Sequence, residues 1–293
     1  MRRRISLALL AAVLAAPPAD AQQRAPAFPT IVAPRLQVAQ ADSGGSDVGL
    51  FDSRDLYFAG GFVAATIILT PLDRALATTL RNERLQDNPF LKKTAAGARL
   101  LGVPGGLILS TGTYVGGKVT GNRDVAELGL HTATSVLTAN LIIGGIKGVA
   151  GRARPYQNPE NPYDFKLFAG VSDEARRSFP SGHTASAFAA AAAATTEVGY
   201  HWHDNKLLVG TALFTLAGLT GVSRIYDNKH WASDVAVGAA IGSFTGWKVT
   251  RYMQAHPNNT IDRLLIGEAE DEDGAVPDNS GGIPIIISIP TSF

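Results

Sequence analysis

Six apolar or alanine-rich segments of helical length divide the middle of the chain. They lie near residues 56–70, 98–117, 125–149, 182–198, 206–222 and 231–252, separated by polar breaks that contain glycine or proline. Segments of this length with little period-2 alternation favour helices over strands. Helices joined by short connections bury their apolar faces against one another. The sequence therefore predicts an all-α fold, a helical bundle of about six core helices.

The two ends of the chain differ from this middle part. Residues 1–21 combine a basic start, an apolar run and a small-x-small site, Ala19 to Ala21, which is typical of a secretory signal peptide. A retained membrane anchor is the alternative. Residues 22–54 are predicted to be a flexible linker and 255–293 an acidic flexible tail with an apolar C-terminal segment. This leaves 55–254 as one helical domain, exported to the periplasm or cell envelope.

The composition narrows the class of partner. The chain of 293 residues is 45% hydrophobic, which is enough for one substantial core, and it contains no cysteine, so no disulfide supports the fold. The formal net charge is only +1. A balance of this kind gives no support for nucleic-acid binding, so no nucleic-acid partner is expected. Any cationic site must be local.

Three short clusters contain the candidate site residues of the predicted helical domain. Lys147 and Arg154 lie in "KGVAGRARP", Ser181 and His183 in "PSGH", and Arg224 in "SRIYDNKHWASD". "PSGH" precedes an alanine-rich helical run, so the free N–H groups at the start of that helix form a seat for an anion. The three cations offer ammonium and planar guanidinium groups that suit phosphoryl oxygens. A simple N-cap is the alternative role for Ser181.

The last cluster also contains His230 and Asp234, four positions apart. On a helix these residues share a face, and a carboxylate there can accept the Nδ1 proton and leave Nε2 free. A buried, mutually satisfied pair is the alternative for these two residues taken alone.

In order and spacing, the clusters K-x6-R-P, P-S-G-H and S-R-x5-H-x3-D resemble the signature of the type 2 phosphatidic acid phosphatase superfamily. That superfamily includes bacterial class A acid phosphatases, lipid phosphatases and vanadium-dependent haloperoxidases. The resemblance extends over roughly 56–252 and implies the helical fold of that superfamily.

The resemblance also implies a role for each residue of the clusters. His230 would attack phosphorus and form a phosphohistidine, His183 would act as general acid and then base, and Asp234 would orient His230. The phosphate-binding residues implied in this way are Lys147, Arg154, Ser181, Gly182 and Arg224. Because cations already neutralise the phosphoryl group, no metal or other cofactor is expected, and vanadate is expected to bind as a phosphate mimic.

The function expected from these features is that of a metal-independent phosphatase for phosphomonoesters or for lipid phosphates and pyrophosphates. A vanadium-dependent haloperoxidase and a non-catalytic anion- or lipid-binding envelope protein are the alternatives. The partner is a phosphorylated small molecule or lipid, with a membrane surface as a further possibility. Substrate identity and oligomeric state depend on surfaces that the motifs do not describe.

Several other features are set aside or left open. "GTYVGGKVT", 112–120, lacks the Ser or Thr and the preceding strand of a P-loop. His201 and His203 have no further ligand cluster, and His131 is interpreted as a satisfied histidine rather than a catalytic one. Gly238, Gly242 and Gly246 repeat every four residues and allow close helix approach.

Two expectations concern the surroundings of the clusters. The segment between the first two clusters predicts a long loop over the pocket, with Phe165, Phe168, Arg176 and Arg177 as candidate substrate contacts. For the domain as a whole, polar residues in the 125–149 segment and a mean hydropathy of only +0.08 favour a bundle that does not span a membrane. Peripheral or integral membrane association stays open.

Overall fold

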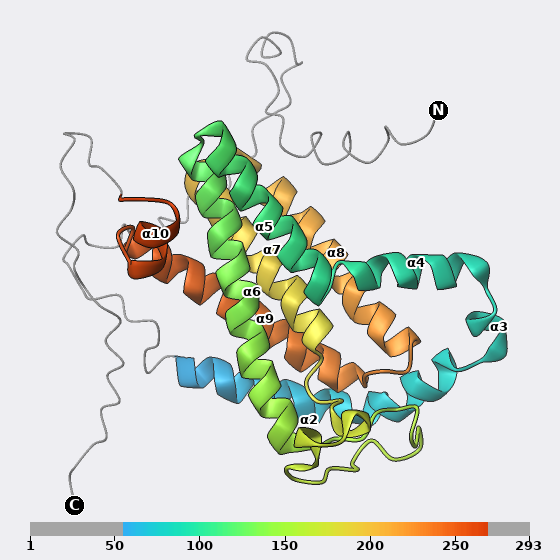
Figure 1. The fold of residues 1–293 in the computed structure, drawn as a ribbon. Coiled ribbons are helices and arrows are strands. Elements are labelled where there is room, and N and C mark those ends of the chain that lie inside the picture. The colour runs from blue at the N-terminus through green and yellow to red at the C-terminus, as the bar shows by residue number, and fades with distance from the viewer. Residues whose placement is uncertain (1–54, 269–293) are drawn as a thin grey trace, which may run out of the picture. The chain divides into compact units, whose positions relative to one another are not determined.

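The computed structural model describes residues 55–268, which form an α-helical bundle (Figure 1). Its helices are α2 (Asp55–Leu80), α3 (Glu83–Gln86), α4 (Pro89–Leu100), α5 (Val103–Thr120), α6 (Arg123–Ala150), α7 (Gly182–His201), α8 (Lys206–Tyr226), α9 (Ala232–Ala255) and α10 (Thr260–Leu265). All six predicted segments lie in helical regions, so the all-α prediction is confirmed. The predicted signal peptide and linker lie outside the described residues.

Helix α7 forms the centre of the bundle. It packs against α5, α6, α8 and α9, and it runs between them in Figure 1. Its sequence is alanine-rich, and six of its buried residues are alanines at positions 185, 187, 189, 191, 192 and 193. Small side chains let neighbouring helices approach closely, while alanine keeps the helix propensity high. The central position of α7 is therefore a consequence of its composition.

Glycines also bring α7 and α9 into close contact. A Cβ atom added at Gly242 would lie 2.2 Å from the carbonyl oxygen of Ala185, and one at Gly246 would lie 2.4 Å from that of Ala189. Gly238 meets the backbone of Ser181 in the same way, at 2.5 Å. The glycine repeat of α9 thus allows backbone-to-backbone packing, as the sequence predicts.

The predicted 98–117 segment is not a single helix. Helix α4 ends at Leu100, Gly102 forms the N-cap of α5, and α4 extends away from α5 to one side of the bundle (Figure 1). Pro104 lies in the first turn of α5, where its missing N–H costs nothing, whereas inside one continuous helix it would leave a backbone carbonyl of the preceding turn without its donor. The break at this position follows from that local sequence.

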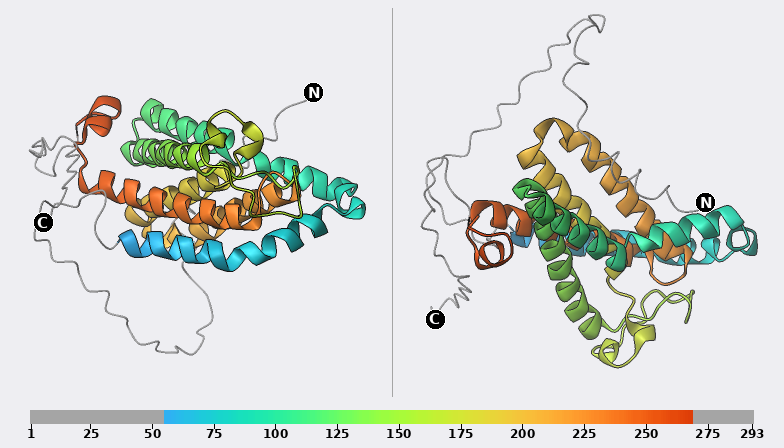
Figure 2. Two further views of the ribbon diagram at one scale, coloured as in Figure 1. Left: turned by 90° about the horizontal axis from the view of Figure 1, so that it is seen from below. Right: turned by 45° about the horizontal axis from the view of Figure 1, so that its top comes forward.

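Helix α2 covers the outer side of α9, and the two run side by side in the left view of Figure 2. Between α6 and α7, residues 151–181 contain two short 3₁₀ helices, η2 (Ala169–Val171) and η3 (Glu174–Arg176), and an isolated bridge between Arg152 and Phe165. This is the long loop that the sequence predicts between the first two clusters.

The predicted start of the flexible tail, residue 255, is too early, because helix α10 follows it. Helix α10 packs onto the bundle, because Asp262 lies 3.1 Å from Nε2 of His131 and the Tyr114 hydroxyl donates to the Leu265 carbonyl over 2.8 Å. His131 also contacts Glu197 through Nδ1, over 2.6 Å. Its interpretation as a satisfied core histidine is therefore confirmed. The tail prediction for 269–293 lies outside the described residues.

The structure does not support the expectation of a bundle that stays outside the membrane. Within residues 55–268, three helical stretches are long and apolar enough to cross a membrane: Asp55–Leu80, Arg123–Ala150 and His203–Tyr226. All three expose large apolar side chains, among them Leu56, Val63, Ile67, Ile68, Leu137, Leu141, Leu207, Leu208 and Val222. Exposed apolar patches of this kind mark interaction sites. The structure thus supports association with a membrane.

Replacing Gly242 by alanine should destabilise the bundle by about 1–3 kcal/mol, because the added methyl group forces α7 and α9 apart. Gly218→Ala in α8 is the matched control, since nothing lies within 4 Å of its added Cβ. That variant should gain about 0.5–1 kcal/mol from helix propensity. Thermal unfolding of both variants in the same detergent measures the difference. Equal melting temperatures would contradict the close packing described here.

Candidate active site

The three sequence clusters meet at one cavity of about 270 Å³. Lys147 comes from the last turn of α6, Arg154 from the following loop, Gly182 and His183 from the start of α7, and Arg224 from the last turn of α8. His230 lies in the connection between α8 and α9. The full lining consists of Val103, Asn140, Ile143, Gly144, Lys147, Arg154, Glu174, Arg177, Gly182, His183, Arg224 and His230. Six of the predicted site residues are therefore brought together.

The start of α7 faces this cavity without a side-chain cap. Ser181 is the N-cap residue, but its hydroxyl lies 2.8 Å from that of Thr184 and accepts no hydrogen bond from the backbone of the first turn. The N–H groups of that turn have no intrahelical acceptor, and the positive end of the helix dipole adds to their attraction for an anion. Gly182 lines the cavity, while Ser181 is completely buried behind it. The predicted contact between the Ser181 hydroxyl and phosphate thus stays a prediction.

The cavity is lined by four cationic side chains, those of Lys147, Arg154, Arg177 and Arg224. Lys147 donates from Nζ to the Arg177 carbonyl over 2.6 Å, and Arg224 donates from Nη1 to Asp227 over 2.9 Å. The Nε of Arg224 is buried with no hydrogen-bond partner. An unsatisfied buried donor on a guanidinium is costly, and an anion in the cavity is the kind of partner it lacks.

One carboxylate, Glu174, competes for these cations. It forms an ion pair with Nη2 of Arg154 and lies 3.4 Å from Nε of Arg177. Because Glu174 is mostly exposed, it can move away at little cost. In the cavity lining, four cations face this single carboxylate, so the site carries a net positive charge. Glu174 would therefore compete with an anion in the cavity for the two arginines.

His230 is oriented by a backbone carbonyl rather than directly by Asp234. Its Nδ1 lies 2.6 Å from the carbonyl oxygen of Ser178 and 3.6 Å from Oδ2 of Asp234. A carbonyl oxygen only accepts, so Nδ1 carries the proton and Nε2 is left without one. The free Nε2 that the sequence predicts is thus retained, and Asp234 lies within ion-pair distance of the imidazole, although the hydrogen bond of Nδ1 goes to the Ser178 carbonyl. His230 precedes α9, which begins at Ala232, so the two residues do not lie on one helix.

Asp234 is fully buried and occupied by other donors. Its Oδ2 accepts from the Ser178 hydroxyl over 2.5 Å and from the Trp231 N–H over 2.9 Å, and its Oδ1 accepts from Arg152 over 2.6 Å. Asp234 is also connected to His230 through Ser178, because the residue whose hydroxyl it binds supplies the carbonyl that accepts from the imidazole.

Burial and charge set the protonation of the two histidines. Burial, together with the nearby Arg224, lowers the pKa of His183 to about 4. Burial and the charge of Lys147 lower the pKa of His230 to about 3. Both imidazoles are therefore neutral in the free site at neutral pH. Burial by itself would raise the pKa of Asp234, but Arg152 and the hydrogen bonds to the carboxylate lower it well below its usual value.

Of the four loop residues that the sequence offers as candidate substrate contacts, Arg177 lines the cavity. Among the described residues of that loop, Arg177 lines the cavity together with Glu174. Arg176 instead forms a two-pronged ion pair with Asp164, over 2.9 and 3.1 Å, and Phe165 packs against Phe179. The composition of the loop predicts a cover for the site, but it does not distinguish the two adjacent arginines.

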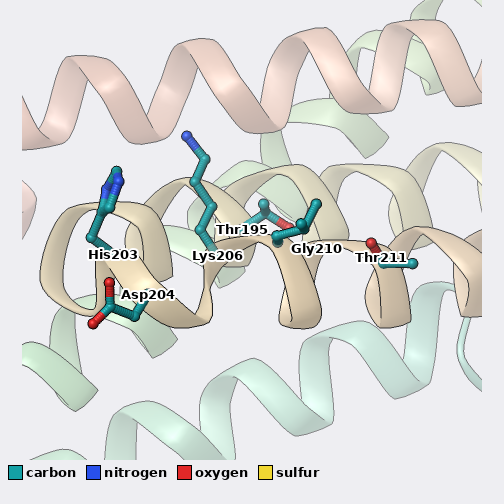
Figure 3. A pocket seen from close by; sticks show the side chains of 7 residues that line it. Thr195, His203, Asp204, Lys206, Gly210 and Thr211 are labelled. Atoms are coloured by element: carbon teal, nitrogen blue, oxygen red, sulfur yellow. The ribbon is translucent and has the colours of Figure 1, made fainter. Parts of the chain in front are cut away.

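A second cavity, of about 360 Å³, lies at the turn between α7 and α8 (Figure 3). Its polar side chains do not converge, since the Asp204 carboxylate and the Lys206 ammonium point in opposite directions. None of the predicted site residues lines it. In residues 55–268, no group of three or more His, Cys, Asp or Glu side chains is suited to hold a metal ion, so His201 and His203 form no such site.

Comparison with known proteins shows that the three clusters belong to one family match. Residues 128–257 match the family model of the PAP2 superfamily, and this range contains every residue of the clusters. Residues 128–257 form a PAP2-superfamily domain. The resemblance noted from the sequence motifs is thereby confirmed, while α2, α4 and α5 precede the matched PAP2 range.

Two curated relatives of the PAP2 domain are lipid A 1-phosphatases. The protein from Porphyromonas gingivalis is 47% identical over 74 residues, which are 25% of this chain and 15% of that protein. The protein from Rhizobium etli is 32% identical over 127 residues, 42% of this chain and 48% of that protein. The chain thus spans less than half the length of either relative.

A solved structure is also similar to the chain. It is the crystal structure of a transmembrane PAP2 type phosphatidylglycerolphosphate phosphatase from Bacillus subtilis, with 21% sequence identity and a TM-score of 0.47. The similarity covers 68% of this chain and 95% of that one.

Glu174→Gln should strengthen the binding of inorganic phosphate by about two- to fivefold, because the variant removes the carboxylate that competes for Arg154 and Arg177. The inhibition constant of phosphate, or its dissociation constant from calorimetry, measures the effect. Glu160→Gln is the matched control, since Glu160 forms a surface ion pair with Arg74 and does not line the cavity. Weaker phosphate binding by Glu174→Gln would show that the carboxylate supports the site instead.

Proposed function

We propose that this protein is a metal-independent phosphatase that acts on lipid phosphates through a phosphohistidine intermediate. The observation that carries the proposal is the position of His230. Its Nδ1 is held by the Ser178 carbonyl, which leaves Nε2 as a nucleophile on a cavity that also contains Lys147, Arg154 and Arg224.

In the first step, Nε2 of His230 attacks phosphorus and the bond from phosphorus to the leaving oxygen breaks. His183, which shares the cavity, gives a proton to that oxygen and the alcohol leaves. In the second step, His183 takes a proton from water, the water oxygen bonds to phosphorus, and the P–N bond to His230 breaks. The products are the alcohol and inorganic phosphate. The proton that His183 gives in the first step comes from the monoanionic substrate, and the proton that it takes from water passes to the phosphate, so His183 is neutral again as in the free site.

The cations of the cavity supply the electrostatic stabilisation for both steps. Lys147, Arg154, Arg224 and the amide of Gly182 are placed to hold the phosphoryl oxygens as charge develops on them. Since three positive side chains and a helix start already balance this charge, we infer that the reaction needs no divalent metal. Vanadate should occupy the same seat as a phosphate mimic.

Two features support a lipid as the substrate. Three helical stretches are long and apolar enough to span a membrane, and α6 and α8 each carry one of the cavity's cations at their ends. Two similar proteins are named lipid A 1-phosphatases. A phosphate attached to a membrane lipid is therefore the substrate class that best fits the site and its surroundings, and export to the cell envelope is part of this proposal.

Purified protein should release inorganic phosphate from a lipid phosphate in mixed micelles, and EDTA should leave the rate unchanged. His230→Ala should lower kcat by about a thousandfold or more, because it removes the attacking atom. His203→Ala is the matched histidine control and should keep full activity, because His203 follows the end of α7 opposite to the cavity. Phosphate release that depends on a divalent ion, or that survives His230→Ala, would contradict the proposal.

The value of kcat/KM should be highest between about pH 4 and pH 6. Above its pKa of about 3, His230 is neutral and can attack, and this form is lost as the pH falls through that value. His183 is uncharged above about pH 4 in the free site, so the proton must arrive with a monoanionic phosphate, whose second pKa is about 6.

Rates measured from pH 3 to pH 9 on a soluble phosphomonoester test this profile, with melting temperatures recorded at each pH as a control for folding. A kcat/KM that stays constant up to pH 9 would show that the proton comes from another group.

A further inference from the structure

A buried group of charges lies behind the cavity, and its two members are not among the predicted site residues. Asp73 of α2 and Arg152 of the loop after α6 are 0% and 1% exposed. Neither residue lines the cavity, and Asp73 lies far before the matched PAP2 range, which begins at residue 128. Buried charges persist only when they are paired, so their contacts indicate what they do.

Arg152 joins two carboxylates. Its Nη2 donates to Oδ2 of Asp73 over 2.8 Å, and its Nη1 donates to Oδ1 of Asp234 over 2.6 Å. The Pro162 carbonyl accepts from Nε and Nη2, over 3.0 and 2.7 Å. All three guanidinium nitrogens therefore have acceptors, and the planar fork of an arginine is needed to meet them together.

Ser233 closes the connection between Asp73 and α9. Its backbone N–H donates to Oδ1 of Asp73 over 2.8 Å, and its hydroxyl donates to Oδ2 over 2.6 Å. Arg152 also donates to the Ser233 hydroxyl oxygen, over 2.8 Å. Asp73 thus binds both the first turn of α9 and the arginine that holds Asp234.

From Asp234 the connection continues to the nucleophile. The Ser178 hydroxyl donates to Asp234 over 2.5 Å, and the Ser178 carbonyl accepts from Nδ1 of His230 over 2.6 Å. Every member of this series is buried, so water does not compete for its hydrogen bonds. A displacement of Asp73 therefore changes the direction in which Nε2 of His230 points.

We propose that Asp73 and Arg152 are positioning residues of the active site, which fix Asp234 and Ser178 and through them aim His230 at phosphorus. Helix α2 is then part of the catalytic apparatus, although it lies outside the PAP2 range. The proposal rests on the phosphatase function proposed above.

Asp73→Asn should lower kcat by about 10- to 100-fold, in the range typical of residues that orient a functional group from behind. The amide keeps an oxygen for the Ser233 N–H but removes the charge that pairs with Arg152. KM should stay within about twofold, because the residues that hold phosphate are untouched. Arg74→Gln is the matched control on the same helix, since Arg74 pairs with Glu160 at the surface, and it should keep full activity.

Ser233→Ala is the second variant, in case Asp73→Asn does not fold. It removes a hydroxyl that contacts both Asp73 and Arg152 but leaves every charge in place. A smaller fall in kcat, of about two- to tenfold, is expected, since one hydrogen bond contributes about 1 kcal/mol. The amplitude of the thermal unfolding transition gives the amount of folded protein in each sample, and each rate is divided by that amount. A kcat that matches the wild type per folded molecule in either variant would overturn the proposal.

A measurement on the imidazole itself separates this inference from the proposed function. With ¹⁵N-labelled histidine, His230 of the wild type should show a single tautomer protonated at Nδ1, and Asp73→Asn should show a mixture of tautomers. Wild-type protein without phosphatase activity but with this change would refute only the function. An active wild type whose His230 signal is unaltered in Asp73→Asn would refute only the positioning role.

Discussion

The buried carboxylate of Asp234 connects the parts of the chain that make up the active site. It accepts hydrogen bonds from Arg152, from the Ser178 hydroxyl and from the Trp231 N–H, so it joins the loop after α6, the segment before α7 and the start of α9. An ionised carboxylate without access to water is tolerated only when donors satisfy its oxygens in this way. The position of His230 is a consequence of that requirement, because Ser178 carries both the hydroxyl held by Asp234 and the carbonyl that holds the imidazole.

Close packing of the helices places this carboxylate next to the phosphate seat. Gly238 of α9 meets the backbone of Ser181. The Ser181 N–H also donates to the carbonyl of Asp234 over 3.0 Å, which brings the first turns of α7 and α9 together. A side chain at Gly238 would separate the start of α7, with its free N–H groups, from the start of α9. The glycine repeat therefore sets the distance between these two parts of the candidate site.

The bundle contains buried charge in two regions, and the balance of charge differs between them. Around His131, the carboxylates of Glu197 and Asp262 meet both ring nitrogens, so this imidazole finds its partners within the protein. Around the cavity, four cations share a single lining carboxylate, and the Nε of Arg224 has no partner. An excess of donors on a cavity wall favours an anionic ligand, whereas a balanced group favours stability. The charge distribution thus distinguishes the candidate active site from the buried charges around His131.

The sequence by itself determined the all-α fold, the helical segments and the membership of the cavity for Lys147, Arg154, Gly182, His183, Arg224 and His230. These features follow from local patterns, since helix periodicity and motif spacing are written along the chain. Only the tertiary structure decided that Ser178 rather than Asp234 accepts from His230, that Arg177 and Glu174 face the cavity, and that Asp73 reaches the site from α2. Such contacts join residues far apart in the chain, and they depend on how α2, α7 and α9 pack, which no local pattern specifies.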